Sequence, residues 1–388
     1  MRKIIGISTR ALLLGGGLIA FGNTRAVCAA VDPKPSGIYV ATHSDPDKLL
    51  AESTFFLDNA DVEGAFIRLR WNELEPGNGS FLWTSLDEQL ARTKKGRTGK
   101  KVSIGVIAGQ FTPSWLYTST ASVKSVELKV VLHETNPTVA SRTCVTMTVP
   151  VPWDPNYLYY WDRFLHAFSK HIQDKFPIVY ERITVVKITG INRESLEIRL
   201  PQQVGIQGKD CTSSDANEKW LAAGYKRAHI AAAWKAILGS FAHSFPTKSL
   251  SMAVIDEDTA FPVFNDDPID KALTQRLIEI GTQQFRGTGR FIVQSNAVMP
   301  RYGTPAIVKA AANSGIYTGY QLRLLTSNDF VHDCPSSSLA CTSWVNATVN
   351  NVLSQGGKFL EVYPDTVEKF PDQMTTGKAL FNAAPAAP

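Results

Sequence analysis

The stretch Gly64-Ala-Phe-Ile-Arg-Leu-Arg-Trp-Asn-Glu-Leu-Glu-Pro-Gly-Asn-Gly-Ser-Phe-Leu-Trp-Thr-Ser-Leu-Asp87 decides the predicted fold. Its first part, Ala65 to Trp71, is a short apolar run with two arginines, which is typical of a buried strand whose end reaches something polar. A turn follows at Glu75 to Gly79, and a helix is expected to begin near Thr84. A buried strand that leads through a polar loop into a helix is the unit of an α/β barrel, where the chemistry lies at the C-terminal strand ends.

The same alternation continues along the chain. Apolar runs predict eight strands, at residues 37–42, 65–71, 101–108, 183–190, 250–255, 290–296, 315–322 and 358–363. Helical patterns lie between them, including 157–176 and one continuous helix over 217–241. Right-handed crossovers between parallel strands then favour a closed barrel, so the expected fold class is α/β, a (β/α)8 TIM barrel. Residues 118–150 interrupt the rhythm and predict a β-hairpin inserted after the third strand.

The first thirty residues have the composition of a secretory signal. Arg2 and Lys3 form a basic start, Ala11 to Phe21 is apolar, and Ala26 to Ala30 are mostly small. The apolar stretch is shorter than the ~20 residues that span a membrane. We therefore expect a signal peptide over residues 1–30, a single barrel domain over 31–388, and a secreted or periplasmic protein. Cys28 raises the alternative of lipid attachment, but the usual branched residue three places before it is missing.

Charge excludes some classes of partner. The chain has 40 basic and 35 acidic residues, and its first thirty residues contain four of the basic ones and no acid. Removing them leaves 36 basic against 35 acidic residues, a net charge near +1. A nearly neutral chain is not expected to bind nucleic acid or an anionic membrane surface.

Four cysteines remain after the signal: Cys144, Cys211, Cys334 and Cys341. An even number in an exported chain predicts disulfides, and three pairings are possible. The turn-like sequence between Cys334 and Cys341 favours that local pair, which leaves Cys144 with Cys211. No cysteine has a histidine at the spacing of a zinc site, so we expect no metal and no cofactor.

The opening stretch also resembles a known enzyme group. Its pattern W-x-x-x-E-P-x-x-G-x-(aromatic)-x-W-x-x-L-D resembles the second strand and loop of clan-A glycoside hydrolases, especially the family 42 and family 35 β-galactosidases. The match is tight over one strand and one helix and loose over the rest of the chain. The resemblance implies a barrel enzyme that hydrolyses glycosidic bonds in a carbohydrate, with β-galactosides as the first substrate to test.

Glycoside hydrolysis normally needs an acid and a second carboxylate that acts as nucleophile or base. In clan A the acid is the Glu of an Asn-Glu pair at the end of strand four, but here Arg193 follows Asn192. Glu194 and Glu197 come next, and the choice between them stays open. Glu197 has apolar neighbours, which favour the protonated form that an acid requires, whereas Glu194 lies nearer the strand end. At least one of them is expected to pair with a neighbouring arginine.

The second carboxylate departs further from the clan pattern. The clan places its nucleophile at the end of strand seven, where this chain has Tyr320-Gln321. Glu361 lies instead in the apolar run predicted as strand eight, and burying an unpaired carboxylate is costly. We expect Glu361 to be the nucleophile or base, to pair with Arg68 or Arg70, or to do both. If the strand count is wrong by one, Glu361 takes the position of the clan nucleophile.

Other strand ends supply residues suited to sugar binding, because polar groups there orient hydroxyls and aromatic faces stack on sugar rings. The resulting candidates are Arg68, Arg70, Trp71, Trp115, Asp256, Gln294, Asn296, Gln321 and Tyr363. Trp115 belongs to a P-x-W-L sequence that resembles a cleft-lining segment of the same glycosidases, although packing of the barrel rim is an equal alternative.

Three other functions are alternatives to glycoside hydrolysis. A carbohydrate-binding protein on an inactive glycosidase-like barrel is the main alternative, because both clan signatures are altered. A serine esterase is disfavoured because the chain has no G-x-S-x-G sequence. A nucleotide enzyme is disfavoured because neither a P-loop nor a G-x-G-x-x-G sequence is present. The sequence therefore predicts a secreted glycoside hydrolase.

Overall fold

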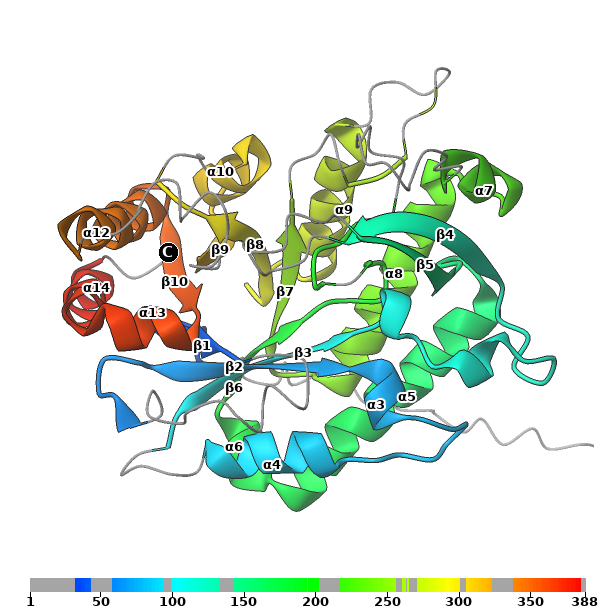
Figure 1. Ribbon diagram of the computed structural model, residues 1–388, viewed down its shortest axis with the longest axis horizontal. Helices are drawn as coiled ribbons and strands as arrows, with labels where there is room; N and C mark the ends of the chain where they lie inside the picture. The colour runs from blue at the N-terminus through cyan, green and yellow to red at the C-terminus, as the bar shows by residue number, and fades with distance from the viewer. Residues whose placement is uncertain are drawn as a thin grey trace, which may run out of the picture. The chain divides into compact units, whose positions relative to one another are not determined.

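Eight parallel strands close into a barrel in the computed structural model (Figure 1). Around the ring they follow one another in chain order, β1-β2-β3-β6-β7-β8-β9-β10, and β10 pairs with β1 to close it. The strands are β1 (Gly37–Ala41), β2 (Gly64–Arg70), β3 (Lys101–Ile107), β6 (Ile183–Lys187), β7 (Ser249–Val254), β8 (Phe291–Val298), β9 (Tyr317–Leu322) and β10 (Gly357–Val362). The predicted (β/α)8 fold is confirmed.

The structure describes residues 32–42, 58–93, 99–132, 143–193, 195–201, 216–255, 260–262, 264, 271–300, 305–322 and 338–384. All of them belong to one compact unit, Val31–Pro388. The predicted signal peptide and its cleavage lie outside these residues, as do Cys211 and Cys334. Secretion, the signal and the disulfide pairings therefore stay predictions.

Helices surround the barrel (Figure 1). They are α3 (Trp71–Leu74), α4 (Thr84–Arg92), α5 (Pro155–Lys175), α6 (Pro177–Glu181), α7 (Ala216–Ala222), α8 (Arg227–Ser244), α9 (Lys271–Gln284), α10 (Ala306–Asn313), α12 (Ser338–Ser354), α13 (Pro364–Lys369) and α14 (Pro371–Ala383), with 3-10 turns η1 (Gly109–Phe111) and η2 (Ser114–Tyr117). None of the described helices has an apolar stretch that could cross a membrane.

Local sequence explains where helices begin and end. Asp154 caps α5, since its side chain accepts hydrogen bonds from the backbone N–H of Asn156 and Tyr157. The prediction of one helix over 217–241 was wrong, because α7 ends before Gly224, whose φ of +83° favours glycine. Trp71, predicted as the last residue of strand two, instead begins the short helix α3.

Two further strands lie between β3 and β6. β4 (Ser125–Leu132) and β5 (Thr143–Pro150) pair antiparallel as a separate two-stranded sheet, in register from Ser125 with Pro150 to Leu132 with Thr143. The residues that join them, 133–142, lie outside the described part of the chain. The predicted inserted hairpin therefore stays a prediction, although its two strands pair as a hairpin requires.

The residues that alternate along the barrel strands form layers inside it. Four buried apolar side chains make one cluster: Tyr39, Val185, Ile292 and Phe359. A second apolar cluster contains Ala41, Phe66, Ile107, Leu196 and Tyr363. Chain order places the second cluster nearer the C-terminal strand ends. The barrel strands also contain buried polar residues, among them Ser103, Lys187, Ser251, Gln294 and Glu361.

Candidate active site

The polar layer is built around Glu361, whose side chain has no exposed surface. Glu361 lies on β10 beside Gln321 of β9. Its Oε1 is 2.5 Å from Nζ of Lys187, at the end of β6, and accepts a hydrogen bond of 3.2 Å from the hydroxyl of Ser103 on β3. An ion pair and a hydroxyl donor therefore hold this oxygen from the opposite side of the barrel.

The other oxygen of Glu361 is held by amides. Nε2 of Gln294 donates to Oε2 over 2.7 Å, and Nε2 of Gln321 lies 3.5 Å from it. The side-chain amide oxygen of Gln294, Oε1, accepts hydrogen bonds from Lys187 and, over 3.2 Å, from the hydroxyl of Ser251. Both carboxylate oxygens thus have partners, as buried polar atoms require.

A chain of amides leads from this layer toward Glu197. Nε2 of Gln294 also donates to Oδ1 of Asn296 over 3.0 Å, and Nδ2 of Asn296 donates to Oε1 of Glu197 over 2.8 Å. Oε2 of Glu197 is buried and has no hydrogen-bond partner among the described residues. Two of the predicted catalytic carboxylates are therefore joined through two side-chain amides, and one oxygen of Glu197 is left for another partner.

Glu197 is positioned by the chain that follows β6. It forms an isolated parallel bridge with Ala253 of β7, and the backbone N–H of Ile198 donates to the Ala253 carbonyl over 2.9 Å. The segment therefore lies against the C-terminal part of β7, the end where barrel enzymes place their chemistry.

Tyr363 and Arg68 complete the group. The Arg68 guanidinium carbon lies 5.3 Å from the centre of the Tyr363 ring. Burial raises the pKa of Tyr363, and the charges of Glu197 and Glu361 raise it further, whereas Arg68 opposes the shift. Both carboxylates therefore lie close enough to act electrostatically on one phenol. Arg68 also donates from Nε to the carbonyl of Thr42, which fixes it to β1.

Leu196 covers the polar layer. Its buried side chain packs with Phe66, Ile107 and Tyr363. A Cβ placed on Gly105 would come within 2.9 Å of both the Leu196 side chain and Cβ of Lys187, so glycine makes room for both of them. Leu196 and Lys187 therefore meet inside the barrel, and the Lys187–Glu361 pair is shielded from water.

Three predicted binding residues, Arg70, Trp71 and Trp115, have contacts outside the group around Glu361 and Glu197. The Arg70 side chain donates to Glu73 over 3.1 Å and covers the Phe111 ring at 4.4 Å. Trp71 is fully buried, and its ring packs 4.8 Å from that of Trp161 on α5. This packing assigns Trp71 to the aromatic core rather than to an open cleft.

Trp115 belongs to η2 and contacts the loop that follows β2. Its indole N–H donates to the carbonyl of Glu75 over 3.0 Å, and its ring stands edge-on to Tyr160 at 5.2 Å. This is the rim-packing alternative, and the half-buried ring leaves a part open to solvent. Glu194 and Asp256, also predicted site residues, lie outside the described residues, so their roles stay predictions.

Lys187 and Leu196 were not among the predicted site residues. A signal for Lys187 was present, because it is a charged residue in the apolar run Ile183 to Ile188. The argument that singled out Glu361 in its own strand applies equally to Lys187. Leu196 carried no such signal, since a leucine in a loop is unremarkable without its three-dimensional neighbours.

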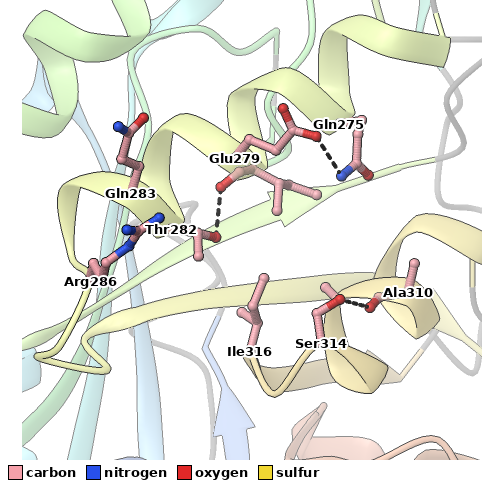
Figure 2. Close-up of a pocket in the computed structure, with 10 residues that line it drawn as sticks. Gln275, Glu279, Thr282, Gln283, Arg286, Ala310, Ser314 and Ile316 are labelled. Carbon is pink, nitrogen blue, oxygen red and sulfur yellow. Dashed lines mark hydrogen bonds between the residues drawn. The ribbon is translucent and has the colours of Figure 1, made fainter.

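A pocket of about 410 Å³ lies elsewhere, between α9 and α10 (Figure 2). Several of its polar residues bond within their own helical segments: Gln275 donates to Glu279 over 3.1 Å, and the Ser314 hydroxyl donates to the Ala310 carbonyl over 2.9 Å. Within the described part of the chain, no cluster of three or more His, Cys, Asp or Glu side chains could hold a metal ion.

Comparison with known proteins gives similar folds and no family. No family model and no curated protein matches the sequence. Among solved structures, the chain is similar to an endo-glycoceramidase II from Rhodococcus sp. (TM-score 0.49, 11% identity, 90% of this chain and 80% of that one). It is also similar to a β-mannanase from the blue mussel Mytilus edulis (0.47, 10%, 92% and 94%).

A third similar structure is an exo-β-1,4-mannosidase from Opitutaceae bacterium strain TAV5 (TM-score 0.48, 11% identity), of which the chain covers 61% while 91% of the chain is matched. These solved structures are glycoside hydrolases. Likeness at this level concerns the fold and carries no argument about activity. The expected resemblance to families 42 and 35 in particular is not confirmed.

Proposed function

We propose that this protein hydrolyses glycosidic bonds at the C-terminal end of its barrel, with Glu197 and Glu361 as the two carboxyl groups. The supporting observation is that Asn296 and Gln294 join these two side chains, while Oε2 of Glu197 is buried without a partner. Two carboxyl groups held in fixed relation at the strand ends are what glycoside hydrolysis requires.

The environments of the two groups suggest different roles. Glu197 is partly exposed and has an unpartnered oxygen, which suits an acid that gives its proton to the leaving oxygen. Glu361 is held at both oxygens, by Lys187 and Ser103 at Oε1 and by Gln294 at Oε2, and this fixed position suits a nucleophile or base. Glu361 can act as nucleophile or as base, and β-galactosides are the first carbohydrate substrates to test for this protein, which we propose to be secreted.

A second candidate is a carbohydrate-binding protein without catalysis. It is favoured by the complete burial of Glu361 and by the partners on both of its oxygens. Because no part of that carboxylate is exposed, neighbouring side chains would have to move before a sugar could touch it. In this alternative Glu361 and Lys187 only stabilise the barrel, and sugars bind above them.

The two candidates are separated by assaying a panel of aryl glycosides with the wild type, Glu197→Gln and Glu361→Gln. We expect each variant to lose several orders of magnitude in kcat while remaining folded. The control is Glu88→Gln, which changes an exposed carboxylate on α4 and should keep full activity.

Activity that survives Glu361→Gln contradicts the paired mechanism. Activity that survives only Glu197→Gln moves the acid role to Glu194. Sugar binding by a folded wild type that hydrolyses none of the panel, or of a matching set of polysaccharides, supports the binding protein instead.

A further inference from the structure

Lys187 has the most unusual environment of the charged residues near the candidate site. It is the last residue of β6, and only 1% of its side chain is exposed. Its ammonium lies 4.7 Å from the centre of the Phe66 ring and 5.2 Å from that of Phe359. Two aromatic faces and one carboxylate therefore surround a charge that has no contact with water.

Burial lowers the pKa of Lys187, and the neighbouring Glu361 opposes that shift. An ammonium removed from water is strongly disfavoured unless it is paired and hydrogen-bonded. Here it has one carboxylate and the carbonyl oxygen of Gln294 as partners. The charge on Lys187 and the charge on Glu361 thus depend on each other.

The contacts distinguish the two oxygens of Glu361. Oε1 is held by Lys187 and Ser103, while Oε2 has the amide of Gln294 at 2.7 Å and that of Gln321 at 3.5 Å. The contact at 3.5 Å is at the limit of a hydrogen bond, so Oε2 has the weaker set of donors. A group approaching Glu361 would therefore displace less at Oε2 than at Oε1.

From this geometry we propose that Lys187 is a positioning residue, which fixes the Glu361 carboxyl group by its Oε1 and leaves Oε2 as the oxygen that acts on the substrate. This inference rests on the proposed function. Within the described part of the chain, Tyr39 from β1 and Tyr363 beyond β10 interact electrostatically with Glu361, and Arg68 from β2 and Glu197 beyond β6 interact with Tyr363. Among these groups Lys187 is the one in direct ion-pair contact with the carboxylate.

The test compares Lys187→Met and Lys187→Gln with Lys248→Met. Lys248 is an equally buried lysine that pairs with Asp32 over 2.5 Å and lies just before β7, at the opposite end of the barrel from the candidate site. Each variant is assayed for kcat, KM, the pH dependence of kcat and thermal stability. Lys187→Gln keeps a hydrogen-bond donor and serves where Lys187→Met does not fold.

Both Lys187 variants should lose about 10²–10³-fold in kcat, as expected when a group that stabilises charge at a reacting centre is removed. KM should change little. The pH dependence of kcat should differ from that of the wild type, because the charged group in contact with Oε1 of Glu361 has been removed. Lys248→Met should be less stable but keep the wild-type kcat and pH profile. A folded Lys187 variant with a wild-type pH profile would overturn the proposal.

A second measurement does not depend on turnover. Infrared difference spectra of protein labelled with ¹³C at the Glu carboxyl carbon, with Glu361→Gln as the subtraction, isolate the carboxyl bands of Glu361. We expect these bands to shift in Lys187→Gln, because the ion pair to Oε1 is lost, and to stay unchanged in Lys248→Met. Unshifted bands in Lys187→Gln reject the role of Lys187. The expected shift, found in a protein that hydrolyses no glycoside, would reject the proposed function alone and keep the assignment of Lys187 as the group that holds Oε1 of Glu361.

Discussion

Among the residues that the structure describes, the two glutamates Glu75 and Glu361 are completely buried, and they are buried in different ways. Glu75, in the loop after β2, accepts hydrogen bonds from the indole of Trp71 and the backbone N–H of Gly79, each over 3.0 Å, and pairs with the half-buried Arg163. Glu361, inside the barrel, pairs with a lysine that is itself buried. The first carboxylate has a counter-charge that reaches water, and the second does not.

The difference separates structure from chemistry. Glu75 belongs to the sequence pattern that pointed to a glycosidase-like barrel, yet its side chain closes the loop between β2 and α4 and ties that loop to Arg163 of α5. Glu361 belongs to no recognised pattern, yet it is linked to Glu197 through Gln294 and Asn296. The residues that identify a fold are therefore not the residues that carry the proposed reaction.

The largest effect on stability should come from removing one member of the buried Lys187–Glu361 ion pair. Glu361→Leu leaves the Lys187 ammonium buried without its partner, and such a change costs about 3–5 kcal/mol of unfolding free energy. Urea denaturation of the variant measures the loss. A loss below about 1 kcal/mol would show that Lys187 finds water or another partner when the carboxylate is removed.

The double variant Lys187→Met/Glu361→Leu sharpens the same comparison. Because apolar groups of similar volume often replace a buried ion pair without loss, we expect the double variant to be more stable than Glu361→Leu by about 2–4 kcal/mol. The readout is again urea denaturation, combined as a double-mutant cycle. A double variant no more stable than the single one contradicts the pairing.

A smaller effect on stability is expected at Glu75. Glu75→Gln removes the charge that Arg163 faces but keeps an oxygen that can accept from Trp71 and Gly79. The expected loss is about 1–2 kcal/mol, less than at Glu361 because Arg163 can turn to solvent. Glycosidase activity should not change, and a loss of kcat in a folded Glu75→Gln protein would contradict the assignment of Glu75 to the loop.

The smallest effect on stability is expected at Glu197. It is partly exposed and has one hydrogen bond, from Asn296, so Glu197→Gln should change the unfolding free energy by no more than about 0.5 kcal/mol. Thermal denaturation checks this value, while the glycoside assay should show its large loss of activity. A strongly destabilised Glu197→Gln protein would mark Glu197 as a structural residue.

The barrel could be predicted from the sequence because each buried strand is a local apolar run. All eight predicted strands correspond to strands of the barrel, and the prediction that Glu361 lies in the eighth one is confirmed. The partner of Glu361 could not be predicted, because Lys187 is distant in the chain and meets it only after the barrel closes. The sequence suggested Arg68 or Arg70 as the ion-pair partner, whereas the closed barrel brings Lys187 of β6 to the carboxylate.

The break between α7 and α8 was missed for a related reason. One helix was predicted over 217–241, but the neighbours of Gly224 form the hydrogen bonds of a helix end, with the N–H of Tyr225 donating to the Trp220 carbonyl over 2.9 Å. Local sequence contained the glycine, but the choice between a weak helix and a break depended on tertiary packing.

The two amides that join Glu361 to Glu197 have one more consequence. A side-chain amide neither gains nor loses a proton at ordinary pH, so Gln294 and Asn296 fix the spacing of the two carboxyl groups without relaying protons between them. The two amides therefore hold the carboxyl groups at a fixed separation and do not transfer protons from one to the other. In a protein that uses both carboxyl groups, each catalytic cycle would have to exchange its protons through the substrate or through water at the barrel mouth.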